Sequence, residues 1–114
     1  MSRGGIPVRM TLTFNRIPEL TSSMRAAAER EVLRSAYEIE AEAKRRVPVD
    51  TGALRNSIQT WRSGSLRASV APHMEYAAFV EFGTRKQRAR PYMVPAAEYV
   101  RPKFVEAMRR IVGG

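Results

Sequence analysis

The fold of this chain is decided by the stretch IPELTSSMRAAAEREVLRSAYEIEAEAKRRV (residues 17–47). We predict that it is an amphipathic helix beginning near Pro18 and Glu19 and ending before Pro48, with cations in its last turn. At roughly 28 residues it would be about 40 Å long, so part of it should pack outside its own domain. The prediction rests on apolar side chains that recur every three or four residues, the period of one helix face: Leu20, Met24, Ala28, Val32, Ala36, Ile39, Ala43 and Val47.

Directly after this stretch comes Asp50-Thr51-Gly52, a motif also found at the active site of aspartic proteases. A protease would bury it in a loop between apolar strands, so that two carboxylates share a proton. Here a charged helix end precedes the motif and no flap hairpin follows, so we expect a structural turn. Asp50 should accept hydrogen bonds from backbone N–H groups and cap a short turn over residues 51–56. Gly52 should give the backbone the freedom for a tight reversal.

Strand-like segments lie on both sides of the helix and this turn. In residues 6–14 apolar and polar side chains alternate, and Pro7 near the start indicates an edge strand. Residues 57–63 and 66–71 predict a hairpin around a tight turn at Gly64-Ser65. The expected orientations in the hairpin are core for Leu66, Ala68 and Val70, and solvent for Arg67 and Ser69. Trp61 should lie in the core or, as the alternative, at an interface.

The end of the chain has helical character. Residues 75–82 allow a strand by their partial alternation, but the three-four spacing of their apolar residues favours a short helix closed by Gly83. A terminal helix should follow, with Pro95 at its first position, and Pro102 should kink or divide it.

These elements predict one α+β domain over residues 1–114. In it a long helix and a C-terminal helix pack on a small antiparallel sheet, made of the N-terminal strand and the hairpin. The N-terminal arm 1–5 and the loop 84–91 are expected to be mobile.

Composition excludes several kinds of site. The chain has no cysteine, so disulfides, thiolate metal sites and thiol nucleophiles are absent. The single histidine, His73, should be a solvated side chain rather than a ligand or a base. No residues group as nucleophile, base and orienting partner, so we expect no catalysis, no cofactor and no metal. The sequence has neither a signal-peptide core nor an apolar run of about 18 residues, so we expect no membrane span.

The net charge of +9 favours an anionic partner such as nucleic acid or an acidic protein surface. The best candidate for the contact is the loop 84–91, which could bind phosphates or an acidic neighbouring subunit. Only Tyr92 adds an aromatic ring nearby, so recognition of particular bases is not indicated. Glu81 either pairs with the arginines that follow it or is solvated. The cations of the loop are Arg85, Lys86, Arg88 and Arg90.

Two blocks, AEAKRRVPVDTGALRNSI (41–58) and YAAFVEFGTRKQRARPYMVPA (76–96), together resemble a known family. The family comprises the small head–tail joining proteins of long-tailed bacteriophages, also called neck, tail-completion or minor tail components. The resemblance covers residues 40–97. The matching positions are Pro48 to Gly52, Leu54-Arg55, Ser57-Ile58, Tyr76-Ala77, Glu81 to Thr84, Arg90-Pro91 and Pro95-Ala96.

The resemblance implies a virion structural protein without enzymatic activity. It would form a homo-oligomeric ring of six or twelve copies at the junction of tail and DNA-filled head, after assembly in the host cytoplasm. Its partners would be further copies of itself, other neck and tail proteins and, non-specifically, packaged DNA. The first strand could extend a neighbour's sheet by edge pairing. The alternative is a free-standing basic nucleic-acid-binding protein, which would show a strongly salt-dependent affinity for DNA.

Overall fold

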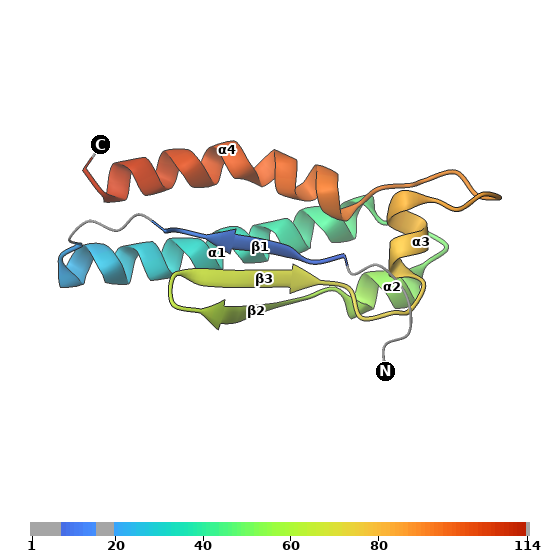
Figure 1. Ribbon diagram of the computed structural model, residues 1–114, viewed down its shortest axis with the longest axis horizontal. Coiled ribbons are helices and arrows are strands. Elements are labelled where there is room, and N and C mark those ends of the chain that lie inside the picture. The colour runs from blue at the N-terminus through green and yellow to red at the C-terminus, as the bar shows by residue number, and fades with distance from the viewer. Residues whose placement is uncertain (1–7, 16–19, 114) are drawn as a thin grey trace.

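A computed structural model describes residues 8–15 and 20–113 of the chain. The described strands form one antiparallel sheet in the order β1-β3-β2, which places β1 at an edge, as predicted. Figure 1 shows α1 running along the sheet, α4 beside α1 and β1, and α2 and α3 at one end. The predicted α+β fold is therefore confirmed; Pro7 and the arm 1–5 lie outside the described residues. The elements are β1 (Met10–Thr13), α1 (Ser22–Arg46), α2 (Gly52–Ser57), β2 (Gln59–Gly64), β3 (Arg67–Ala71), α3 (Ala77–Phe82) and α4 (Met93–Ile111).

Helix α1 ends where the sequence predicts and begins later. Its last residue is Arg46, and Val47 before Pro48 is already extended, with φ −63° and ψ 138°. At the other end the hydroxyl of Thr21 accepts a hydrogen bond from the N–H of Met24 at 3.1 Å, so the helix starts at Ser22. The predicted start near Pro18 and Glu19 was wrong because this threonine caps the helix; both residues lie outside the described part.

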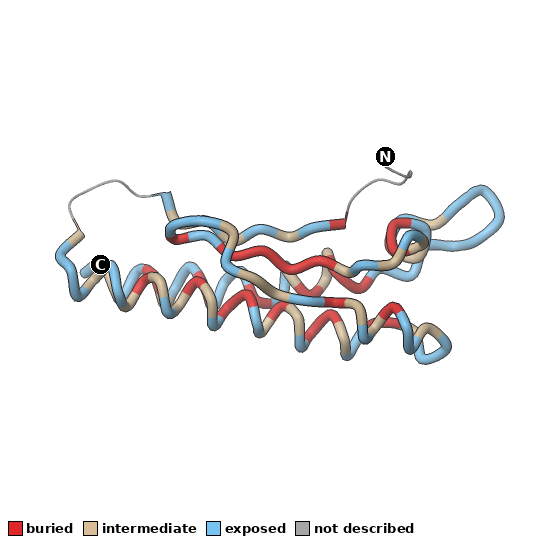
Figure 2. The backbone as a smooth tube through the Cα atoms, turned by 90° about the horizontal axis from the view of Figure 1, so that it is seen from below, coloured by how far each residue is buried: buried red, intermediate tan, exposed pale blue. Residues whose placement is uncertain are grey.

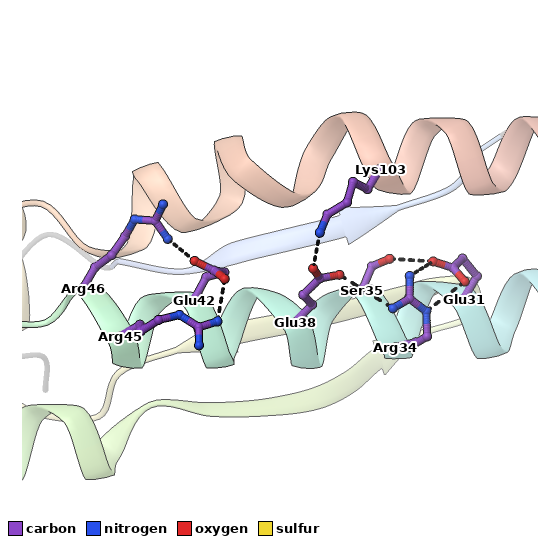
Figure 3. Close-up of polar contacts among 8 residues, drawn as sticks. All are labelled: Glu31, Arg34, Ser35, Glu38, Glu42, Arg45, Arg46 and Lys103. Carbon is purple, nitrogen blue, oxygen red and sulfur yellow. Dashed lines mark hydrogen bonds and ion pairs between the residues drawn. The ribbon is translucent and has the colours of Figure 1, made fainter.

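The length of α1 is explained within the domain. Helix α4 packs along it (Figure 1), and Lys103 of α4 donates to Glu38 of α1 at 2.6 Å (Figure 3). The length of α1 therefore gives no reason to expect that the helix packs outside its own domain, because α4 covers the turns for which the prediction required another partner. The buried residues of α1 are Ala28, Val32, Ser35, Ala36, Ile39, Glu42 and Ala43.

The acidic residues of α1 are engaged by cations close by. Arg45 and Arg46 both donate to Glu42 (Figure 3). Burial raises the pKa of the Glu42 carboxyl, but the hydrogen bonds from Arg46 and Arg45 outweigh it and hold the pKa below its usual value. Ion pairs of this kind neutralise many of the cations on the helices, so most of the excess positive charge lies in other parts of the chain.

Of the two effects predicted for Pro102, a kink or a division of the helix, the division was wrong, because α4 runs unbroken through this residue. Pro102 and Glu98, whose carbonyl loses its helical partner, are both exposed, and water can satisfy that carbonyl. The helix also begins at Met93, so that Pro95 is its third residue rather than its first. Proline costs little there because the N–H of this position has no intrahelical acceptor.

The hairpin differs by one residue from the prediction. Its turn lies at Ser65 and Leu66 instead of Gly64-Ser65, because Gly64 belongs to β2 and the pairing of β2 with β3 is irregular between Arg62 and Gly64. Leu66 has a φ of +51°, rare for leucine, and its side chain is buried. Burial of this side chain offsets the unfavourable backbone.

One orientation in the hairpin was also wrong, and one of two alternatives was excluded. Ser69, predicted to face solvent, is buried on the central strand between the hydroxyls of Thr11 at 3.1 Å and Ser63 at 2.8 Å. Trp61, expected in the core or at an interface, lies on the same sheet face as Ser69 and is half-buried, so it is not in the core; the rings of Trp61 and His73 are 6.0 Å apart. Ser69 is buried because side chains of the neighbouring strands cover it on this face. Leu66, Ala68 and Val70 are buried as predicted.

Candidate functional site

The two segments that the sequence singled out lie at the same end of the molecule. The Asp50-Thr51-Gly52 turn, helices α2 and α3, and the loop 84–91 gather there (Figure 1). Arg90 of the loop lies 3.7 Å from the carboxylate of Asp50. The loop is exposed throughout (Figure 2). Among the described residues no carboxylate pairs with Arg85, Lys86 or Arg88.

The loop is shaped by its own hydrogen bonds. The hydroxyl of Thr84 accepts from the N–H groups of Lys86 at 3.1 Å and Gln87 at 3.0 Å. The N–H of Thr84 donates to the Gln87 carbonyl at 2.9 Å, and that of Arg90 to the Val80 carbonyl at 2.8 Å. These bonds present the cations from a defined turn.

Gly83 is the residue on which this turn depends. Its φ is +80° and its ψ 176°, a combination open almost only to glycine. A Cβ at this position would lie 2.7 Å from the backbone nitrogen of Ala89 and 2.9 Å from the carbonyl oxygen of Gln87. The returning arm of the loop therefore packs directly on the glycine backbone. The predicted short helix over 75–82, closed by Gly83, is confirmed as α3.

Glu81 joins the loop to the rest of the fold. Its side chain is 2% exposed, and its carboxylate accepts the N–H groups of Tyr92 at 3.0 Å, Met93 at 2.8 Å and Val94 at 3.0 Å. These are the first free N–H groups of α4, where a negative charge is favoured. Both expectations for Glu81, an arginine pair or a solvated carboxylate, were therefore wrong: it caps a helix that starts twelve residues later.

Tyr92 completes this junction from the buried side. Its side chain is fully buried, and its hydroxyl donates to the carbonyl of Ala77 at 3.0 Å. Burial, with the nearby Glu81 carboxylate, raises the pKa of Tyr92, so the phenol stays neutral and remains a donor. The C-terminal end of the loop is thus bound to α3 by the side chains of Glu81 and Tyr92.

The Asp50-Thr51-Gly52 turn is held differently from our prediction. Thr51 makes the closing contacts: its N–H and its hydroxyl donate to the Pro48 carbonyl at 3.0 Å and 2.6 Å. In the described part of the chain the Asp50 carboxylate accepts no backbone N–H, and it is 72% exposed. Gly52 is the first residue of α2, is not among the glycines with positive φ, and needs no special freedom. The turn is structural, but threonine stabilises it.

We expect Thr51→Val to destabilise the protein by about 1 kcal/mol, the usual loss for one hydrogen bond. Asp50→Asn should change the free energy of unfolding by less than about 0.5 kcal/mol, since an exposed pair at this distance contributes little. Urea unfolding measures both. If Asp50→Asn lowered the free energy of unfolding more than Thr51→Val, the aspartate rather than the threonine would be the residue that caps the turn.

Exposed aromatic residues accompany the cations, and sequence reasoning did not place them at the surface. Phe79 is 55% and Phe82 52% exposed, one turn apart on α3, while the buried residues of that helix are Ala77, Ala78 and Glu81. The sequence did contain a signal for this orientation. Ala77 and Ala78 are small, so α3 can pack closely against the fold with its alanine side inward. Exposed aromatic rings beside cations are typical of protein-binding surfaces.

The described residues offer little for chemistry. They contain no group of three or more potential metal-ligating side chains, and no helix among them is long and apolar enough to cross a membrane. His73 is exposed, as predicted, and its Nδ1 lies 3.0 Å from the Ser57 carbonyl. This end of the small α+β fold carries an exposed surface that is basic and partly aromatic.

The chain belongs to the HK97-gp10-like family, described as "Bacteriophage HK97-gp10, putative tail-component", whose model matches residues 10–83. The match covers well over half of the chain, from β1 to the glycine that closes α3. No curated protein and no solved structure matched the chain. Family membership assigns the protein to the structural components of phage tails, with other tail proteins as its partners, and confirms the resemblance seen in the sequence.

Proposed function

We propose that this protein is a ring-forming subunit of the head–tail junction, and that the basic loop with Phe79 and Phe82 forms its contact with a neighbouring protein. The proposal rests on the way in which the end of the molecule with α3 and the loop 84–91 is built. A glycine in a conformation open almost only to glycine and a buried carboxylate hold an exposed cationic turn. Such preorganisation lowers the entropy cost of binding.

A protein partner fits this surface better than free DNA. Phosphate binding uses cations and needs no exposed phenylalanine, whereas a protein interface combines aromatic residues with charges at its rim. The partner should be acidic around an apolar centre, since Arg85, Lys86 and Arg88 are exposed without a pairing carboxylate in the described chain. Contact with packaged DNA would then be secondary and non-specific.

The test replaces Arg85, Lys86 and Arg88 by glutamate in a phage that carries the gene. We expect DNA-filled heads and complete tails to accumulate separately in electron micrographs, with infective particles reduced at least a hundredfold, because the loop would repel its partner. Native mass spectrometry of the wild-type protein with its neighbours should show a closed ring.

The matched control replaces Arg30, Arg67 and Arg110, three exposed cations away from the loop, by glutamate. Both triples lower the net charge equally, so only the position of the change differs. Normal joining with the loop triple would contradict the proposal. If joining stays normal but the purified loop triple loses a salt-dependent affinity for DNA that the control triple keeps, the nucleic-acid-binding alternative is correct.

A further inference from the structure

An apolar groove lies between the free edge of β1 and α4, away from the basic loop. Two adjoining hollows of about 300 Å³ and 410 Å³ form it, and they share Thr13, Phe104 and Val105. Val105, one of its lining residues, is 39% exposed, although the nearby Val100, Phe104 and Met108 of the same helix are buried. Arg101 and Arg109 are the cations that line it. Other apolar lining residues are Met10, Leu12, Phe14 and Met108.

Within residues 8–15 and 20–113, the backbone beside this groove has hydrogen-bonding groups without a strand partner. The N–H of Phe14 donates to the Leu66 carbonyl at 3.0 Å, so the even-numbered residues of β1 pair with β3. In an antiparallel ladder the alternate residues point the other way. The N–H and C=O groups of Thr11 and Thr13 therefore face the free edge, where the described residues provide no further strand. An exposed edge of this kind is a template for another strand.

The charges beside the groove indicate which kind of strand could bind in it. Among the described residues Arg101 forms no ion pair, and Arg109 pairs only with Glu106, its neighbour one turn away, at 3.2 Å. A second copy of the chain would bring a net charge of +9, and its other free edge, β2, carries Arg62. Like charges would meet, so a second copy is disfavoured and a negatively charged segment is favoured.

We propose that this groove binds an extended acidic segment of a partner protein, which adds to β1 as a fourth strand. Its backbone pairs with Thr11 and Thr13. Alternate apolar side chains pack against Val105 and Leu12, and its carboxylates lie beside Arg101 and Arg109. This surface is distinct from the basic loop, so the inference does not rest on the proposed ring or on head–tail joining.

The test uses blocked peptides of about nine residues, long enough to span a strand. In one, valine alternates with glutamate; in the second, lysine replaces every glutamate; the third has the acidic composition without alternation. We expect the alternating acidic peptide to bind with a micromolar dissociation constant in fluorescence anisotropy, and the other two at least tenfold more weakly. Equal binding of the acidic and lysine peptides, or no binding of the acidic one, would overturn the proposal.

Proline substitutions test the edge pairing. Thr11→Pro removes an N–H that faces the groove and leaves the ladder with β3 intact, because proline is tolerated at outward-facing edge positions. We expect it to weaken acidic-peptide binding at least tenfold. Arg62→Pro, at an outward-facing position of the opposite edge, should change it less than twofold. Unchanged binding by Thr11→Pro refutes the pairing. Self-association that only Thr11→Pro abolishes would assign the groove to a second copy and refute the acidic partner.

A charge exchange tests separately whether the groove prefers an acidic strand. It is the deciding test if circular dichroism shows that Thr11→Pro does not fold. The double variant Arg101→Glu, Arg109→Glu should bind the lysine peptide at least tenfold more tightly than the acidic one. Retained preference for the acidic peptide would show that these arginines do not face the ligand, and would overturn the proposal.

Discussion

Replacing Glu81 by alanine should lower the free energy of unfolding by about 3 kcal/mol and the melting temperature by about 10–20 °C. The change removes a buried carboxylate that accepts three backbone N–H groups and leaves the N–H groups of two buried residues, Tyr92 and Met93, without an acceptor. It also removes the negative charge at the start of α4. Thermal unfolding followed by circular dichroism measures the effect.

Two further variants calibrate this result. Glu81→Gln keeps one carbonyl oxygen in place and should cost about half as much. Glu75→Ala removes an exposed glutamate just before α3 and should change stability by less than about 0.5 kcal/mol. If Glu81→Ala were no more damaging than Glu75→Ala, the carboxylate would not be the cap of α4.

Replacing Gly83 by alanine should destabilise the protein by about 3 kcal/mol, since alanine pays for both the backbone conformation and a steric overlap. The Cβ would lie 2.7 Å from the backbone nitrogen of Ala89, and backbone cannot move aside as a flexible side chain can. The loop should therefore open. Trypsin, which cleaves after the loop cations, should cut the variant at least tenfold faster than the wild type.

Gly52→Ala is the matched control because the same substitution is made where no constraint exists. Its added Cβ would have no atom within 4 Å, and Gly52 is the first residue of a helix. Alanine there should be neutral or stabilise the protein by up to about 1 kcal/mol through the unfolded state. Equal effects of the two substitutions would refute the special role of Gly83.

The two glycines also mark where sequence reasoning succeeded and where it failed. Gly83 was recognised as the residue that closes α3, because a helical spacing ended there. Gly52 was given a similar role because it follows Asp50, and the structure shows an ordinary helix start. A motif in one short stretch does not reveal which of its residues makes the contact, and Thr51 rather than Asp50 makes it.

Periodic features were predictable from the chain itself. The apolar face of α1 and the inward residues of β3 follow from spacings of three, four or two. The end of α1 before Pro48 and the edge position of β1 were predicted from prolines in the sequence. The exposed cations of the loop were also predictable because burying four unpaired charges would be costly. Fold class and the exposure of the loop cations therefore required no tertiary information, whereas the exposed Phe79 and Phe82 did.

Contacts between distant segments needed the tertiary structure. Glu81 meets the start of α4, α4 covers α1, and Ser69 is buried by neighbours on two other strands. The local sequence largely determines which helix or strand a residue forms, since that depends on neighbours along the chain. Which polar group meets which depends on how the elements pack, and only the folded chain decides this.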